Sequence, residues 1–341
     1  MKKIITLSLL CLIAVLPATA QKKKKVQTPT PKEVGLASIN RATSEAVIEF
    51  LACDELEGRE SGFQGSYIAS QYLASQLKQL GVKPLYDSYF QEFDAYSKDR
   101  YNGRRYSVVP DSISKWTKGV NRKLHMRNVL GVIPGERSDE YVVVGAHLDH
   151  LGMDPALNGD QIYNGADDNA SGVSAAFQIA RAFLASGKKP LRTVIIAFWD
   201  GEERGLLGSR YFVDHCSFLE KIHGYLNFDM IGRNNKPENP PYVVYFFTAS
   251  HPKFGEWLKN DIQQYSLHLD PDYRAWDNPV GGSDNGNFAV HNIPIIWYHT
   301  DGHPDYHGVG DHADRLNWEK VVEITKASFL NAWNLANEEE Y

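Results

Sequence analysis

Apolar residues recur at helical spacing in four stretches of the chain. In residues 67–80 they lie three and four positions apart, before a glycine at position 81 that stops a helix. Residues 171–186 carry one apolar stripe, which Gly187 closes. We expect helices in these two stretches, and also in residues 44–51 and 318–336.

Between residues 139 and 300 the pattern changes to short, continuous apolar runs rich in Val, Ile and Phe. Such runs are typical of strands that are covered on both faces. A predicted helix separates the first two runs, and the order strand, helix, strand indicates crossover connections. We therefore expect a single α/β domain whose twisted, mixed and mostly parallel central sheet has helices on both faces. The expected strands are residues 141–144, 194–199, 225–228, 243–247 and 293–298.

The first twenty residues have the pattern of a cleaved export signal. Two lysines precede an apolar run at residues 4–16, and small residues follow it at positions 18–20. Because the run is shorter than the roughly 20 residues that span a bilayer, no membrane span is expected. We expect residues 1–20 to be removed and the mature protein to be soluble, in the periplasm or outside the cell. Lipid attachment at Cys11 is the weaker alternative, since that cysteine lies inside the apolar run.

Composition divides the rest of the chain into a tether and one domain. Residues 21–34 hold four consecutive lysines and two prolines with almost no apolar side chain, which is typical of a solvated tether. Residues 35–341 are expected to form one domain. Asp and Glu exceed Lys and Arg by 42 to 36 without a basic stripe, which disfavours nucleic acid as a partner. Cys53 and Cys216 can pair in an oxidising compartment or stay single.

Candidate metal ligands follow four of the predicted strands. His147 and Asp149 come after the first run, Glu202 and Glu203 after the second, and Asp229 after the third. A loop with several histidines follows the last run. In open α/β sheets the functional crevice lies outside the carboxyl ends of the strands, so these side chains can converge although they are distant in sequence.

Two further carboxylates, Asp167 and Asp168, stand at the start of the predicted helix 171–186. Acidic side chains stabilise a helix N-terminus by about 0.3–1 kcal/mol, and this structural role is the alternative for both aspartates and for the two glutamates. It does not explain why imidazoles and carboxylates occur together at strand ends. Imidazole and carboxylate ligands without thiolates suit zinc or a similar divalent ion.

Five motifs occur in one order along the chain. They are Gly145-Ala146-His147-Leu148-Asp149, Gly165-Ala166-Asp167-Asp168-Asn169-Ala170-Ser171-Gly172, Glu202-Glu203, Phe228-Asp229-Met230 and Asp305-Tyr306-His307. Taken together they resemble the co-catalytic zinc aminopeptidases. Residues 51–59 also resemble the N-terminal motif of that family, so the resemblance covers nearly all of the chain after the tether.

The resemblance implies two zinc ions per chain. It assigns Asp167 to the bridge between the ions, with His147 and Asp229 completing one site. Glu203 and His307 complete the other site. Three more histidines remain alternatives to His307, because Gly308 stands where many relatives have Thr; they are His299, His303 and His312.

The resemblance also implies a reaction. Glu202 is the general base, since it stays free beside the water that the ions activate. Asp149 accepts a hydrogen bond from the imidazole of His147 and fixes its tautomer, and Asp168 has a similar supporting role. The implied reaction is the hydrolysis of N-terminal residues from peptides with a free N-terminus.

Three other functions fit the same fold. Glutaminyl cyclase is the nearest rival, but its members tend to lose part of the ligand set, which this chain keeps. Carboxypeptidase activity is a further option within the family. A catalytically inactive binding ectodomain belongs to another class, and an intact Glu202 with a full ligand set favours an enzyme over it.

Overall fold

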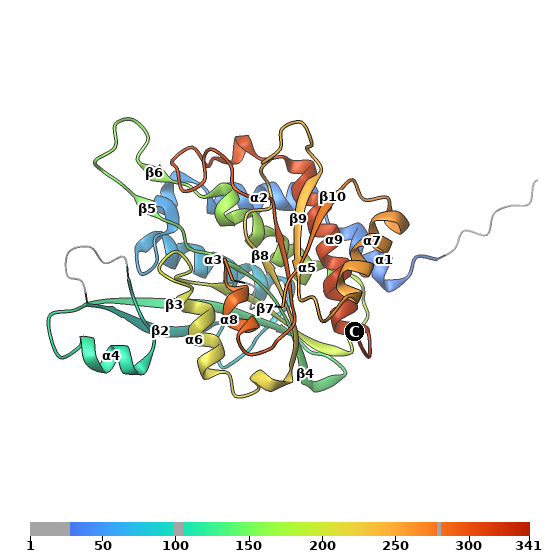
Figure 1. The fold of residues 1–341 in the computed structure, drawn as a ribbon, viewed down its shortest axis with the longest axis horizontal. Coiled ribbons are helices and arrows are strands. Elements are labelled where there is room, and N and C mark those ends of the chain that lie inside the picture. The colour runs from blue at the N-terminus through green and yellow to red at the C-terminus, as the bar shows by residue number, and fades with distance from the viewer. Residues whose placement is uncertain (1–27, 99–104, 278–280) are drawn as a thin grey trace, which may run out of the picture.

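A mixed nine-stranded sheet forms the centre of the computed structural model, which describes residues 28–98, 105–277 and 281–341 (Figure 1). Strand β2 (Phe90–Ser97) pairs with β3 at one side of the sheet. The remaining strands follow the order β1 (Lys83–Pro84), β3 (Arg122–Ile133), β7 (Arg192–Trp199), β4 (Arg137–His147), β8 (Ile222–Phe228), β11 (Ile295–His299), β9 (Tyr242–Phe247) and β10 (Asp270–Ala275).

The four central strands, β7, β4, β8 and β11, run parallel. Strand β3 is antiparallel to β7, and β9 is antiparallel to β11. The carboxyl ends of the four central strands therefore meet at one edge of the sheet. The expected fold class is confirmed.

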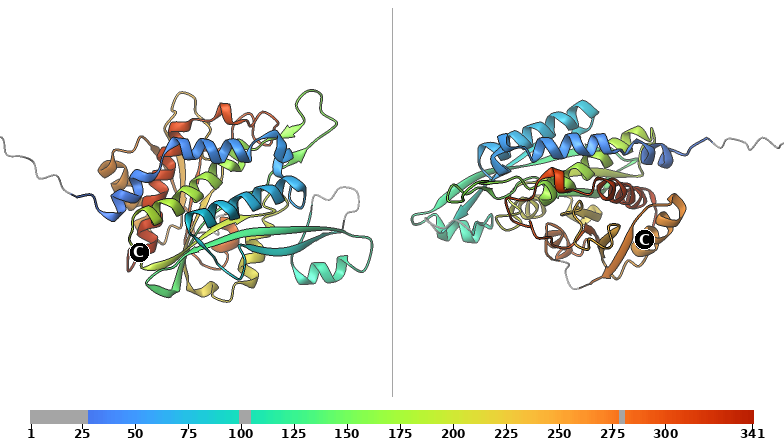
Figure 2. Two further views of the ribbon diagram at one scale, coloured as in Figure 1. Left: turned by 180° about the vertical axis from the view of Figure 1, so that it is seen from behind. Right: turned by 90° about the horizontal axis from the view of Figure 1, so that it is seen from above.

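Helices cover both faces of the sheet. One buried apolar cluster joins the sheet to α1 (Pro31–Ser38), α2 (Arg41–Leu51), α3 (Gln64–Leu80), α5 (Gly172–Ala185), α7 (Lys253–Tyr265) and α9 (Trp318–Asn337). The rear view in Figure 2 shows α2, α3 and α5 in front of the sheet. A second cluster on the opposite face includes α6 (Leu207–His215) and α8 (Asn285–Ala289).

Packing on both faces of strand β4 explains why its sequence is continuously apolar. Val142 and Val144 pack into the first cluster, whereas Val143 between them packs into the second. Since successive side chains of a strand point to opposite faces, a strand covered on both sides needs an apolar residue at every position.

Short elements complete the described chain. Helix α4 (Pro110–Trp116) lies beside the β2 and β3 ribbon, and β5 (Gly152–Met153) pairs with β6 (Ile162–Tyr163). Short helical segments occur at η1 (Asp54–Arg59), η2 (Ala166–Ser171), η3 (Leu219–Lys221) and η4 (Ala313–Arg315). No helix of the described residues has the length and apolar character that crossing a membrane requires.

Part of the segment expected to be a tether is helical. Residues 31–34 form the first turn of α1, because the Thr30 side chain and Glu33 form a capping box and Pro31 fits the first helical position. The expected export signal lies outside the described residues and stays a prediction, which the mass of the mature protein would test. Cys53 and Cys216 are both free thiols.

Candidate metal centre

The carboxyl edge of the sheet gathers the candidate ligands. His147 is the last residue of β4, and Glu203 lies in the loop that follows β7. Asp229 comes directly after β8, and the loop after β11 carries His307. Asp168 enters from η2, the turn that leads into α5. Five segments far apart in sequence therefore meet at this edge.

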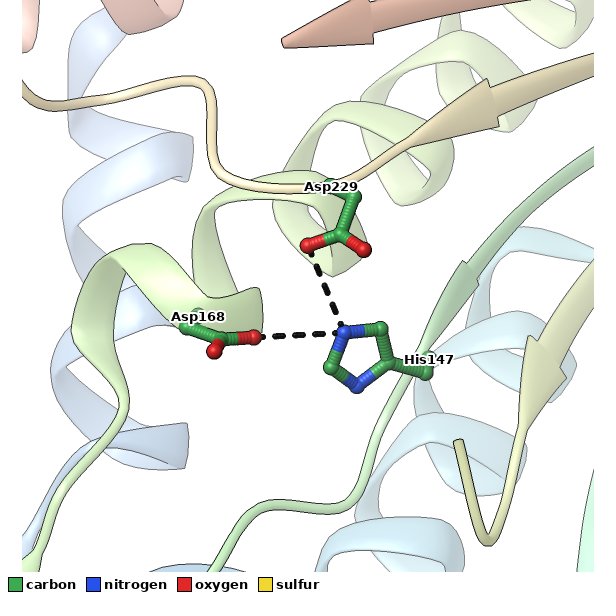
Figure 3. Close-up of side chains that lie close together, drawn as sticks. All are labelled: His147, Asp168 and Asp229. Carbon is green, nitrogen blue, oxygen red and sulfur yellow. Dashed lines mark ion pairs between the residues drawn. The ribbon is translucent and has the colours of Figure 1, made fainter. Parts of the chain in front are cut away.

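The first group consists of His147, Asp168 and Asp229 (Figure 3). The His147 Nε2 atom lies 3.2 Å from Asp168 Oδ1 and 3.5 Å from Asp229 Oδ1. Burial lowers the pKa of His147, but the charges of Asp229 and Glu202 and the hydrogen bonds to the two aspartates outweigh it and hold that pKa well above its ordinary value. The group therefore attracts positive charge, whether a proton or a metal ion.

The second group lies on the other side of Asp168. The His307 Nε2 atom is 3.3 Å from Asp168 Oδ2 and 3.2 Å from Glu203 Oε2. A further imidazole, that of His150, forms a group with Asp168 and Glu203 that could also hold a metal ion, and its Nδ1 atom lies 2.7 Å from Glu203 Oε1. One carboxylate, that of Asp168, thus presents one oxygen to each group.

These separations test whether the residues fit zinc. Ligand atoms bound tetrahedrally at about 2.0–2.2 Å lie roughly 3.3–3.6 Å from one another. The four ligand pairs above are 3.2, 3.5, 3.3 and 3.2 Å apart. Imidazole nitrogens and carboxylate oxygens are also donors that zinc accepts. The two groups fit a dinuclear zinc site, and Asp168 belongs to both of them.

Asp167, the residue expected at the bridge, lies in neither group. Its Oδ1 atom accepts a hydrogen bond from the Gly232 amide at 2.6 Å, and its Oδ2 atom lies 3.4 Å from His303 Nε2. The backbone of η2 departs from helical dihedrals at Asp168 and Asn169, so adjacent side chains of the turn point in different directions. The structure brings Asp168, not Asp167, to both groups.

Asp149 has different partners from those expected. The His147 Nδ1 atom lies 3.2 Å from the main-chain oxygen of Asp149 and 3.8 Å from its Oδ1 atom. The carboxylate instead accepts hydrogen bonds from the amides of Glu202 (3.1 Å) and Glu203 (3.3 Å) and from the Ser61 hydroxyl (2.7 Å). The main-chain carbonyl therefore holds the imidazole, and the carboxylate holds the turn that carries both glutamates.

Glu202 lies beside the first group. Burial raises the pKa of its carboxyl well above the ordinary value, and the negative charges of Asp229, Glu203 and Asp284 act in the same direction against the opposing effect of His147. Asp284 is fully buried, and burial raises its own pKa to about 7. These charges favour the protonated form of the Glu202 carboxyl as long as no cation lies beside it.

The other histidines of the loop after β11 lie elsewhere. The His299 Nδ1 atom contacts the main-chain oxygen of Asp229 at 2.5 Å, and His303 faces Asp167. His312 pairs with Asp160 at 3.0 Å. Of the four histidines considered as the last ligand, His307 is the one that reaches both Asp168 and Glu203.

A buried arginine fixes the segments that carry the site. The Arg59 guanidinium donates hydrogen bonds to the main-chain oxygens of Leu51, Leu148 (2.9 Å), Asn164 (2.6 Å) and Gly165 (2.9 Å). These bonds tie the end of α2 to the loop after β4 and to the start of η2. Sequence reasoning noted the motif around Arg59 but gave the residue no role.

Comparison with known proteins identifies the family. A family model described as Peptidase family M28 matches residues 128–331. The chain belongs to this family. Its class is therefore the metallopeptidases, as the five motifs led us to expect.

Curated relatives of this chain have names that describe different activities. The chain is 28% identical over 284 residues to leupeptin-inactivating enzyme 1 of Streptomyces exfoliatus, covering 83% of this chain and 53% of the relative. It is 31% identical over 263 residues to the probable glutamate carboxypeptidase VP8 of Zea mays, covering 67% of this chain and 33% of the relative. The chain thus spans between a third and about half of the length of these relatives.

Solved structures share the fold. The zinc aminopeptidase BSAP of Bacillus subtilis aligns with a TM-score of 0.67 at 14% identity, over 89% of this chain and 97% of that one. Porphyromonas gingivalis glutaminyl cyclase aligns with a TM-score of 0.63 at 16% identity, over 86% of this chain and 98% of that one. At these identities the likeness shows the fold alone.

Proposed function

We propose that the protein is a two-zinc aminopeptidase, which removes residues from the free N-termini of peptides. The observation that carries the proposal is the Asp168 carboxylate, which faces His147 with one oxygen and His307 with the other. In this proposal Asp168 takes the bridging role expected of Asp167. Asp229 completes the first site and Glu203 the second.

The chemistry follows from this division of the side chains. Zinc ions held by His147, Asp229, Glu203, His307 and the shared Asp168 would supply Lewis-acid activation of a water molecule and of the scissile carbonyl. Glu202 takes a proton from the attacking water and delivers it to the amine nitrogen of the cleaved bond. The Asp149 carboxylate keeps Glu202 in place through the amide hydrogen bond at 3.1 Å.

Charge favours an N-terminal over a C-terminal substrate. The carboxyl of Glu202 lies among further acidic groups, including Asp229, Glu203 and Asp284. Carboxylates that are not zinc ligands in this proposal, those of Glu202 and Asp284, attract the α-ammonium group of a peptide and repel a terminal carboxylate. This favours aminopeptidase activity over the carboxypeptidase named for the Zea mays relative.

Glu202→Gln tests the proposal, since it removes the base and leaves the ligand set intact. We expect kcat on aminoacyl anilides to fall by about 10²- to 10⁴-fold, with zinc content and the unfolding midpoint unchanged. Glu57→Gln, at an exposed position, serves as the matched control and keeps full activity. Near-normal turnover by the Glu202 variant would contradict the assigned role.

Blocked peptides separate the competing activities. An aminopeptidase cleaves a peptide with an amidated C-terminus and leaves an acetylated N-terminus intact, whereas a carboxypeptidase does the reverse. A peptide that begins with Gln detects cyclisation as loss of ammonia without release of an amino acid. Cyclisation alone would replace the proposed function with that of glutaminyl cyclase.

A further inference from the structure

Glu203 contacts two imidazoles through different oxygens. Its Oε2 atom lies 3.2 Å from His307 Nε2, and its Oε1 atom lies 2.7 Å from His150 Nδ1. His150 stands three residues after His147 and has no place in the ligand set that the motifs imply. The implied ligand set contains two imidazoles, those of His147 and His307. The imidazole of His150 is a third one at the same site.

The distances from Glu203 to the two imidazoles indicate which imidazole is a metal ligand and which is a hydrogen-bond donor. Two ligands of one tetrahedral zinc ion lie about 3.3 Å apart, as His307 and Glu203 do. The 2.7 Å separation of His150 and Glu203 is shorter and matches a charge-assisted N–H···O hydrogen bond. The His150 Nδ1 atom also lies 3.8 Å from Asp168 Oδ2, which is longer than the separations within the two groups.

The ring of His150 is held in this orientation by its surroundings. The side chain is buried, and its main-chain amide donates to the Arg59 oxygen at 3.2 Å. A Cβ atom at Gly165 would lie 2.6 Å from the ring, so the glycine leaves the space that the imidazole occupies. A buried and closely packed ring can fix the orientation of the carboxylate that it contacts.

We propose that His150 is a positioning residue that donates its Nδ1 hydrogen to Glu203 Oε1 and so directs Glu203 Oε2 to the second metal site, beside His307 and Asp168. The inference rests on the proposed two-zinc site. His150 does not contact the ion or the substrate in this arrangement. Its effect is on the affinity of one zinc site, through the orientation and basicity of Glu203.

Two substitutions of similar size and polarity test the proposal. In His150→Asn the amide nitrogen can occupy the position of Nδ1, whereas in His150→Gln it reaches the position of Nε2, away from Glu203. Zinc affinities of both sites are measured by competition with a chromophoric chelator. We expect His150→Gln to weaken one of the two zinc equivalents by about 10- to 100-fold, and His150→Asn to remain close to wild type.

Controls make each outcome decisive. His312→Gln replaces an imidazole that pairs with Asp160 outside both groups and should leave both affinities unchanged. Equal affinities in wild type and His150→Gln would overturn the proposal. Equal losses in both His150 variants, with one imidazole fewer in the zinc X-ray absorption spectrum, would make His150 a ligand instead. A wild-type protein that binds two zinc ions but cleaves no peptide would overturn the proposed activity and leave this comparison valid, because affinity is the readout.

Discussion

Neighbouring aspartates in η2 have different environments. Asp168 faces two imidazoles, whereas Asp167 accepts a hydrogen bond from Gly232 and lies against His303. Asp311 holds both of them in place, because its carboxylate accepts the amide hydrogens of Asp167 (3.0 Å) and Asp168 (2.9 Å). The turn is therefore fixed through its main chain. The side chains of Asp167 and Asp168 are free to contact different groups.

Paired amide substitutions distinguish the two aspartates. Asp168→Asn removes the charge shared by both groups, so we expect zinc content to fall from two equivalents to well below one. Asp167→Asn keeps the oxygen that accepts the Gly232 amide and should retain two equivalents. Metal analysis after dialysis measures both variants. The opposite pattern would return the bridging role to Asp167.

Residue roles were only partly predictable from sequence. The positions of His147, Glu203, Asp229 and His307 at strand ends indicated that they converge, and the structure brings them together. The choice between Asp167 and Asp168 depends on the backbone dihedrals of η2, which no spacing rule gives. His150 had a visible signal, since it is a second histidine three residues after His147, but only the distance to Glu203 shows its contact.

At the scale of elements, Asp200 joins three of them. It follows β7, is fully buried, and its Oδ2 atom accepts hydrogen bonds from the Ser66 hydroxyl of α3 (3.2 Å) and the Arg127 amide of β3 (3.1 Å). Burial, together with the negative charge of Asp149, raises the pKa of Asp200 to about 7. The carboxyl thus keeps its proton in the folded protein at a pH where the unfolded chain has lost it.

This shift predicts how stability depends on pH. The folded state binds one proton more than the unfolded state from near the ordinary value of 3.8 up to about 7. The free energy of unfolding therefore falls as the pH rises through this window, by at most about 1.4 kcal/mol per pH unit from this group. Asp200→Asn removes the titration and can still accept both hydrogen bonds.

We expect Asp200→Asn to gain stability relative to wild type as the pH is raised from about 4 to about 7. Urea unfolding of the metal-free protein at several pH values measures this difference. Asp87→Asn, at an exposed carboxyl, is the control and should follow the wild-type profile. Parallel profiles for Asp200→Asn and wild type would show that Asp200 is ionised in the folded protein.

Elements differed in how well their sequences predicted them. All five expected strands and all four expected helices are present, because each is covered on at least one side by the core. The sequence did not indicate β3, whose outer half pairs only with β2 and carries exposed, charged residues. Helix α1 was also missed, since its start depends on the cap at Thr30 and not on an apolar stripe.

At the scale of the whole molecule, the parallel centre of the sheet explains the site. Four strands end at one edge. The last residue of β4 is His147, the segments after the other three strands supply Glu203, Asp229 and His307, and η2 supplies Asp168. Buried Arg59 ties the loop after β4 and the segment before η2 to the end of α2. The fold therefore assembles the metal groups from residues that lie up to 160 positions apart, from His147 to His307.

Anomalous diffraction at the zinc edge tests the central claim most directly. Crystals grown with zinc should show two peaks about 3.5–4 Å apart, with the Asp168 carboxylate between them. One peak should lie beside His147 and Asp229, and the other beside Glu203 and His307. A single peak, or two peaks bridged by Asp167, would contradict the account.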